Sequence, residues 1–239
     1  MLATISLYFL AVGAQGAEPD AATLITKMFR HYSEAQTLTG QIRWIQRAKG
    51  IAIQTDTDVA FERPSKLYIK QTQNGSEPKT WLITSDGKLF SYNKPEVLRG
   101  PESRLVEPVF ASGVSQSIRD IYAVGIRSIG DKSVPLDIAI SRREDLSTLR
   151  GQWATFQVVG KEKLRETNCY VIEGKWREDP GMRPTGTYQL WLSPDGDILR
   201  FALKELFASP QGEIEVTSTW DASLVVNGQV NAKQFTVVK

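Results

Sequence analysis

The chain has 239 residues, of which 41% are hydrophobic and 23% charged, values typical of a globular protein rather than a disordered or membrane-spanning one. Its 29 basic and 27 acidic residues are spread along the chain and leave a net charge of +2, so no nucleic-acid partner is expected. This length suits one large β domain or two small ones. We favour a single domain, because the sequence contains neither a fixed repeat nor a linker.

Residues 1–16 are predicted to be a signal peptide. Met1 to Val12 are mostly apolar, and Ala14-Gln15-Gly16 offers small residues at the spacing that a signal peptidase reads. The run is too short to span a bilayer. No Lys or Arg precedes it, so either the true start lies upstream or the terminal amine supplies the positive charge; the alternative is an apolar segment that frays. The prediction is a soluble periplasmic protein with a single domain at residues 17–239.

A helix is predicted first in this domain. From Leu24 to Tyr32 apolar residues recur at i, i+1, i+4, i+5 and i+8, which places them on one helix face, and Asp20 is a candidate N-cap. Thr39 to Arg47 then alternates as a strand, with Trp44 among the side chains of its apolar face.

Four strands are predicted to follow one another as a meander between Ile51 and Tyr92. Ile51 to Phe61 alternates cleanly, which indicates a long, half-buried antiparallel strand. The Arg63-Pro64 step, where proline removes an amide donor, indicates a hairpin corner. Asp86-Gly87 is the turn signal between the next two strands.

The middle of the chain changes character. Asn93 to Pro108 contains three prolines and is interpreted as a long connection. Helical spacing returns at Val114, Ile118, Ile121 and Tyr122, with Ser112 or Ser115 as the cap. Val134 to Ile140 is a helix turn or a strand, which the pattern alone does not separate. Ser141 to Gly151 is interpreted as a surface loop.

Strands are predicted from there to the end. Period-two apolar residues are Phe156, Val158; Tyr170, Ile172, Trp176; Tyr188, Leu190, Leu192; Leu199, Phe201, Leu203; and Ile214, Val216, Trp220. Pro194 to Asp197 and Asn227-Gly228 are interpreted as hairpin turns, and Gln234 to Lys239 as a closing strand. The predicted fold class is therefore mainly β (α+β), with about ten antiparallel strands, a leading helix and a helical insertion, in a sheet that curls.

Catalysis is not predicted. His31 is the only histidine and Cys169 the only cysteine, so neither a zinc site built from His and Cys nor a disulfide can be assembled, and no Gly-x-Ser-x-Gly motif occurs. Cys169 is predicted to be a small core residue. The carboxylates examined fall on a polar strand face or in a turn and are interpreted as solvated surface; they are Asp56, Asp58, Glu62, Asp195 and Asp197. The prediction is a protein that is not an enzyme and uses no cofactor or metal.

Apolar volume is the remaining signal. Six Trp, nine Phe and seven Tyr are distributed over successive strands. They either fill the interior of a barrel or line a ligand cavity, and periodicity does not choose between the two.

Several motifs together resemble one protein family. They are Phe61-Glu62-Arg63-Pro64 followed by Leu67-Tyr68-Ile69, Ser85-Asp86-Gly87 with Phe90 and Tyr92, Tyr188-Gln189-Leu190-Trp191-Leu192 before Asp195-Gly196, and Phe235-Thr236-Val237. In this order, after a leading amphipathic helix, they resemble the bacterial outer-membrane lipoprotein carrier superfamily of the LolA and LolB type, including its exported relatives. The resemblance covers most of residues 17–239.

The resemblance implies an incomplete antiparallel barrel with a helical lid and a hydrophobic cavity that accepts acyl chains. Arg63 would hold the lid closed, since a guanidinium can bind several carbonyls at once; the alternative is a corner residue that bonds to its own loop. Inward-facing cavity candidates, assigned by alternation, are Trp44, Val59, Phe61, Leu67, Ile69, Trp81, Ile83, Phe90, Tyr92, Leu190 and Phe201.

The function predicted from this resemblance is an exported carrier for the acyl chains of a lipoprotein or lipid. Membrane-bound donor and acceptor proteins are possible partners. The alternative is a periplasmic sensor or adaptor of the same fold, which binds a lipid or protein ligand and regulates a partner.

Overall fold

A computed structural model describes residues 19–76, 78–94, 109–114, 117–126, 133–140, 153–176, 185–210 and 212–237. In these ranges the strands are β1 (Thr37–Ala48), β2 (Ile51–Glu62), β3 (Lys66–Gln73), β4 (Lys79–Asp86), β5 (Leu89–Lys94), β6 (Val109–Val114), β7 (Trp153–Leu164), β8 (Thr167–Trp176), β9 (Thr185–Leu192), β10 (Ile198–Ser209) and β11 (Gly212–Val226). The helices are α1 (Ala21–Ser33), α2 (Ile118–Ile126), α3 (Val134–Ile140) and the short 3-10 helix η2 (Ala232–Phe235).

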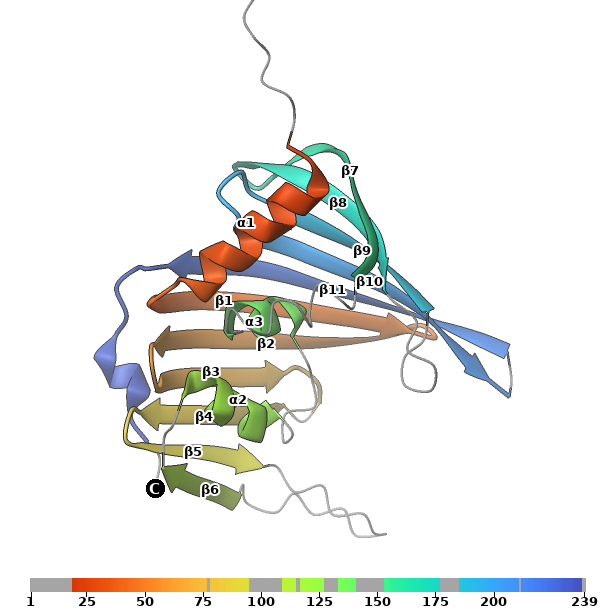
Figure 1. The fold of residues 1–239 in the computed structure, drawn as a ribbon. Helices are drawn as coiled ribbons and strands as arrows, with labels where there is room; N and C mark the ends of the chain where they lie inside the picture. Colours follow the sequence, from red (N-terminus) through yellow and green to blue (C-terminus); the bar gives the residue numbers. More distant parts are fainter. Residues whose placement is uncertain are drawn as a thin grey trace, which may run out of the picture.

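All eleven strands form one antiparallel sheet in the order β6-β5-β4-β3-β2-β1-β11-β10-β9-β8-β7. The sheet is not closed, because β6 and β7 lie at its two edges. Figure 1 shows α1, α2 and α3 on the same face of the sheet, with α2 over β3 and β4. The predicted fold class is confirmed: the molecule is an incomplete antiparallel barrel with a helical lid.

Alternation decides which side chains face the helices. In β1, Ile42 and Trp44 are buried whereas Arg43 is exposed, and β2 buries Val59 and Phe61 on the face opposite Asp58. We call the face that carries Trp44 and Val59 the inner face and the opposite one the outer face. The expectations for both strands are confirmed.

Helix α1 is the longest helix described, and its apolar stripe packs on the inner face. Asp20 caps it as predicted, since its Oδ1 accepts a hydrogen bond from the backbone N–H of Thr23 at 2.7 Å. The buried side chains of α1 include Met28, Phe29 and Tyr32, which join one hydrophobic cluster with residues of α2, α3 and the sheet. We call this cluster the main core.

The middle of the chain differs from the prediction. Residues 109–114, including Ser112 and Val114, form strand β6 rather than the start of a helix, because they pair with β5. Val114 is 73% exposed at the end of this edge strand, and α2 begins only at Ile118. The cap is Ser117, whose Oγ accepts a hydrogen bond from the N–H of Asp120 at 3.2 Å. Pairing across the sheet thus overrides local helical spacing.

The other predictions for the middle of the chain have different outcomes. Val134–Ile140, left open by the pattern, is the helix α3. Asn93, predicted to start a long connection, belongs to β5. Residues 1–18, 95–108 and 141–152 lie outside the described residues, as does Ser115, so the signal peptide and both predicted loops stay predictions there.

The C-terminal strand prediction is wrong for Gln234 to Val237, and residues 238–239 lie outside the described residues. Ala232–Phe235 is a 3-10 helix that contacts β3 and β4, with the ring of Phe235 buried. Asn227 makes a turn, but no described strand pairs with β11 after it, so the predicted hairpin there is also wrong. β11 pairs with β1 from Val216 to Val226 and with β10 from Gly212 to Asp221, whereas the residues after Asn227 bury Phe235 beside β3 and β4 instead of adding a strand.

One facing prediction also fails. Leu199 was expected on the same face as Phe201, but the register shifts between Ile198 and Arg200. Ile198 therefore enters the main core, while Leu199 packs on the outer face against a smaller cluster formed by Cys169, Val171 and Trp191. A bulge that adds one residue inverts the facing of its neighbours.

Candidate functional site

The eleven cavity candidates predicted from alternation all belong to the main core or pack against it. Eight are buried, namely Trp44, Val59, Phe61, Leu67, Ile69, Ile83, Leu190 and Phe201. Trp81, Phe90 and Tyr92 are partly buried and pack against the same cluster. The sheet therefore brings all of them together under the helices, while their role in ligand binding stays a prediction.

Aromatic side chains beyond those candidates continue this surface. Trp220 of β11 stacks on Trp44 with ring centroids 6.2 Å apart, and Phe201 lies 5.7 Å from Trp220. Tyr188 of β9 stacks on Phe201 at 5.7 Å. Trp220 and Tyr188 were predicted as period-two strand residues but were not among the cavity candidates, although their spacing from Ala222 and Leu190 is the signal that could have placed them there.

The turn at Arg63, Pro64 and Ser65 is the point where the helices meet the sheet. The N–H of Arg63 donates to the carbonyl of Gln36 at 2.9 Å, and the N–H of Ile118 at the start of α2 donates to the carbonyl of Pro64 at 2.9 Å. On the sheet side, Ser85 Oγ donates to the carbonyl of Ser65 at 2.6 Å. This turn, which contains a cis Arg63-Pro64 peptide, is thus bonded to α2, to the connection after α1 and to β4.

The Arg63 side chain reaches two helix ends. Its Nε donates to the carbonyl of Ala35, just after α1, at 2.8 Å, and its Nη2 lies 3.5 Å from the carbonyl of Ala139 in the last turn of α3. The guanidinium also lies 5.1 Å from the centroid of the Phe61 ring. These partners lie outside the hairpin corner itself, as expected for a residue that holds a lid. Whether it governs lid closure stays a proposal.

Helix α1 is fastened to the β9–β10 turn. His31 Nε2 lies 2.9 Å from Asp197 Oδ1, and the buried hydroxyl of Tyr32 accepts a hydrogen bond from the N–H of Ile198 at 3.0 Å. The turn comes close because Gly196, at φ +101°, has no Cβ to meet the α1 backbone. The bond to His31 holds the pKa of Asp197 below its usual value, and burial raises that of Tyr32.

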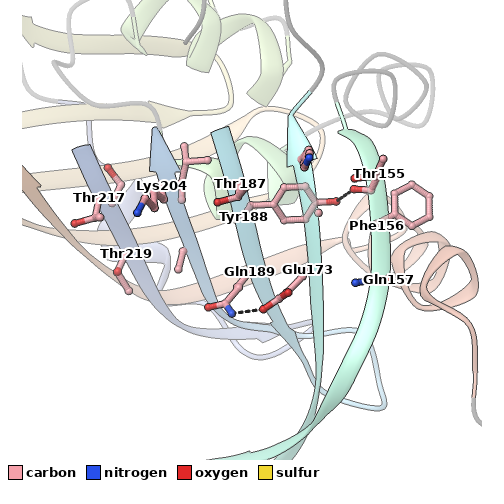
Figure 2. A pocket seen from close by; sticks show the side chains of 15 residues that line it. Thr155, Phe156, Gln157, Glu173, Thr187, Tyr188, Gln189, Lys204, Thr217 and Thr219 are labelled. Atoms are coloured by element: carbon pink, nitrogen blue, oxygen red, sulfur yellow. Dashed lines mark hydrogen bonds between the residues drawn. The ribbon is translucent and has the colours of Figure 1, made fainter. Parts of the chain in front are cut away.

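The outer face carries a hollow of about 790 Å³ that spans β7 to β11 (Figure 2). By alternation, Gln157, Glu173 and Gln189 in its lining point away from the main core. Gln189 Nε2 donates to Glu173 Oε1 at 2.5 Å across the strands, as Figure 2 shows. None of the eleven cavity candidates lines this hollow, although Tyr188 and Leu203 of the main core belong to its lining.

Asp56 and Asp195 lie at the surface as predicted, whereas Asp197 is half-buried against His31. Asp56 pairs with Arg43 at 2.8 Å on the outer face, and Asp195 lies 3.9 Å from Lys27. No group of three His, Cys, Asp or Glu side chains suited to a metal ion occurs in the ranges described. Cys169 is buried as predicted, and burial raises the pKa of its thiol.

No helix in the described part of the chain has the length and apolar character needed to cross a bilayer.

Comparisons with known proteins find similar solved structures. No family model and no curated protein matches the chain. The lipoprotein LppX of Mycobacterium tuberculosis is 14% identical with a TM-score of 0.47, over 89% of this chain and 99% of LppX. A LolA superfamily protein from Nitrosomonas europaea is 13% identical with a TM-score of 0.34, over 92% of this chain and 98% of its own.

A third similar structure is the MucA/MucB complex of Pseudomonas aeruginosa. The matched chain is 11% identical with a TM-score of 0.44, and the match covers 90% of this chain. This chain spans 60% of the length of that one.

Proposed function

We propose that the protein is an exported, non-enzymatic carrier that holds the acyl chains of a lipoprotein or lipid between the half-barrel and its helical lid. The observation that supports this most directly is the construction of the inner face. Its apolar residues are covered by three helices instead of a second sheet, and the main core joins α1, α2 and α3 to 17 buried residues of the described strands.

Exchange of apolar contacts is the physical basis of the proposal. Ile118 and Ile121 of α2, and Leu136 and Ile138 of α3, are buried in the main core. Burial of apolar surface contributes about 25 cal/mol per Å². An acyl chain that takes the place of these side chains restores much of that free energy, so helix displacement and ligand binding offset each other.

Arg63 is proposed to hold the lid closed. Its contact with α3 is a long one, 3.5 Å to the carbonyl of Ala139, whereas its bond to the connection after α1 is short. A long hydrogen bond is weak and is broken at small cost. We therefore assign movement to α2 and α3, which Tyr122 Oη joins by a bond of 2.6 Å to Asp137 Oδ1.

The cellular setting forms part of the same proposal. Residues 1–16 direct export, residues 17–239 act in the periplasm, and membrane-bound donor and acceptor proteins deliver and receive the ligand. The eleven inner-face candidates, from Trp44 to Phe201, line the cavity when it is occupied.

The test is native mass spectrometry of the mature protein purified gently from a bacterium that exports it, followed by denaturing extraction. We expect an acyl-bearing molecule at about one per chain. A protein mass without adduct, together with no uptake of added lipid or lipopeptide, would contradict the carrier proposal. That result would favour the sensor or adaptor alternative, in which the same fold binds a protein ligand.

A further inference from the structure

The inner face holds a polar spot in the middle of its apolar surface. The indole Nε1 atoms of Trp44 and Trp220 are buried and have no hydrogen-bond partner among the described residues, and the same holds for Gln71 Oε1. Trp44, Trp220 and Gln71 are 8%, 3% and 2% exposed. Buried polar groups are nearly always paired, so two unpaired donors side by side require an explanation.

The register of the strands places these groups in two neighbouring rows. Trp44 lies opposite Trp220 on one side and opposite Thr55 on the other. In the next row along the strands, Thr57 lies opposite Gln71. All five positions share the face of the main core, so the rows form a polar band on the floor beneath the helical lid.

The two indoles are arranged as a pair. Their rings stack with centroids 6.2 Å apart and an interplanar angle of 25°, so the two donors belong to adjacent rings. An indole N–H donates and cannot accept, so neither ring can satisfy the other. Both need an acceptor that the described part of the protein does not provide.

The surroundings select the kind of acceptor. Around the indoles the two rows are neutral: the first holds Trp220, Trp44, Thr55 and Gln73, and the second holds Ile42, Thr57, Gln71 and Trp81. The first row reaches a cation only at Lys79, which lies opposite Gln73 on β4, three strands from Trp44. A carboxylate or phosphate bound at the indoles would therefore lack an adjacent cationic partner in these rows, which is strongly unfavourable. A neutral carbonyl attached to apolar chains can accept a hydrogen bond from an indole N–H, and it needs no cationic partner.

We propose that Trp44 Nε1 and Trp220 Nε1 form a hydrogen-bonding site for the ester carbonyls of an acylated ligand. This inference rests on the proposed function, since the ester reaches the indoles only if its acyl chains enter beneath the lid. It narrows the ligand class to neutral acyl esters, in preference to free fatty acids or plain hydrocarbons. Gln71 Oε1 accepts a hydrogen bond from a hydroxyl of the same ligand.

The experiment compares two lipids with the same chains. The full mature protein is titrated with 1,2-dioleoylglycerol and with its diether analogue, 1,2-di-O-oleylglycerol, both delivered from cyclodextrin, and binding is quantified by native mass spectrometry. The diether keeps the hydroxyl and the apolar chains but lacks the carbonyls. We expect the diester to bind about tenfold more tightly, the effect of roughly one net hydrogen bond.

Variants then assign the preference to the indoles. The double variant Trp44→Phe, Trp220→Phe should bring the ratio to about one by weakening the diester alone, because phenylalanine retains an aromatic ring without the N–H. Trp191→Phe is the matched control: Trp191 Nε1 lies on the outer face and already donates to Glu162 Oε2 at 2.8 Å. Circular dichroism checks that each variant is folded.

The outcomes separate the two proposals. Equal binding of diester and diether by the wild type, or a preference that survives in the double variant, overturns the ester site and leaves the carrier intact. Binding of neither lipid overturns both. Loss of the preference in Trp191→Phe as well would also overturn the assignment to the inner face.

Discussion

Helices α1 and α3 cover the same inner face, but they are fastened to the molecule in different ways. The 13-residue α1 has an N-cap and side-chain bonds at 2.9 and 3.0 Å from His31 and Tyr32 to the β9–β10 turn. The seven-residue α3 meets Arg63 at 3.5 Å and is joined to α2 through Asp137. Short helices depend on tertiary contacts for their stability. The difference supports α1 as a permanent part of the core and α3 as the part that opens.

The largest expected effect comes from matched truncations in the two helices. Ile25 of α1 and Ile138 of α3 are 0% and 1% exposed. Ile25→Ala should lower the free energy of unfolding by about 3–5 kcal/mol, as a cavity in the core does. Ile138→Ala should cost less than about 2 kcal/mol, because the loss is limited to the docking free energy of a helix that opens locally.

Urea denaturation measures both variants, and amide hydrogen exchange locates the change. In Ile138→Ala we expect faster exchange in α3 with little change in α1. Equal losses for the two variants, with exchange accelerated everywhere, would mean that α1 and α3 belong to one cooperative unit.

Arg63→Leu is expected to change ligand release. Removal of the guanidinium deletes the contacts to Ala35 and Ala139, which should speed release of a bound fluorescent diacylglycerol by about tenfold, an amount corresponding to about 1.4 kcal/mol. Stopped-flow transfer to lipid vesicles measures the rate. Arg63→Lys keeps the charge but lacks the planar fork, so an intermediate rate is expected. Unchanged release kinetics in a folded Arg63→Leu protein would remove Arg63 from the lid mechanism.

Acid should loosen the attachment of α1. Because the pKa of Asp197 is lowered in the folded protein, chiefly by the bond to His31, the stabilisation is present above the ordinary aspartate value of about 3.9. It is lost as the pH falls from there through the lowered pKa. The loss in the free energy of unfolding at acid pH should therefore be smaller in Asp197→Asn than in the wild type, by about 1–2 kcal/mol.

Urea midpoints at pH 7 and pH 3 test this for wild type and Asp197→Asn. An identical pH dependence in the two proteins would show that this carboxylate does not stabilise the fold.

The smallest effect is expected at the exposed ion pair between α1 and the β9–β10 turn. Lys27 Nζ lies 3.9 Å from Asp195 Oδ1, and both side chains are at least half exposed. Exposed ion pairs contribute little, so Lys27→Ala should change the free energy of unfolding by less than about 0.5 kcal/mol. A larger loss in urea denaturation would indicate that the bond from Lys27 to the carbonyl of Pro194 is also needed to hold α1.

Some of the fold and of the site follows from local sequence. The face of the sheet on which Trp44, Val59 and Phe61 lie was predictable, because side chains along a strand alternate between its two faces. This alternation can be read directly from the sequence. The Asp86-Gly87 turn was also predictable, since Gly87 adopts a positive φ of 95° that favours glycine. The N-cap at Asp20 is a local feature of the same kind.

Other features were decided by contacts between distant segments. Strand β6 forms because β5 offers a free edge, and Ala232–Phe235 forms η2 where the ring of Phe235 is buried beside β3 and β4. His31 meets Asp197, 166 residues away, only when α1 packs on the β9–β10 turn. Whether an indole N–H is paired depends on every group around it.

The sequence by itself therefore determined the antiparallel meander, the apolar inner face and the leading helix, because these rest on period and turn chemistry. Only the tertiary structure decided how many strands the sheet has, which carbonyls Arg63 reaches and that Trp44 and Trp220 stand unpaired within the described residues. The physical reason is that pairing partners and desolvation are set by the whole chain, whereas alternation and turns are set by neighbouring residues.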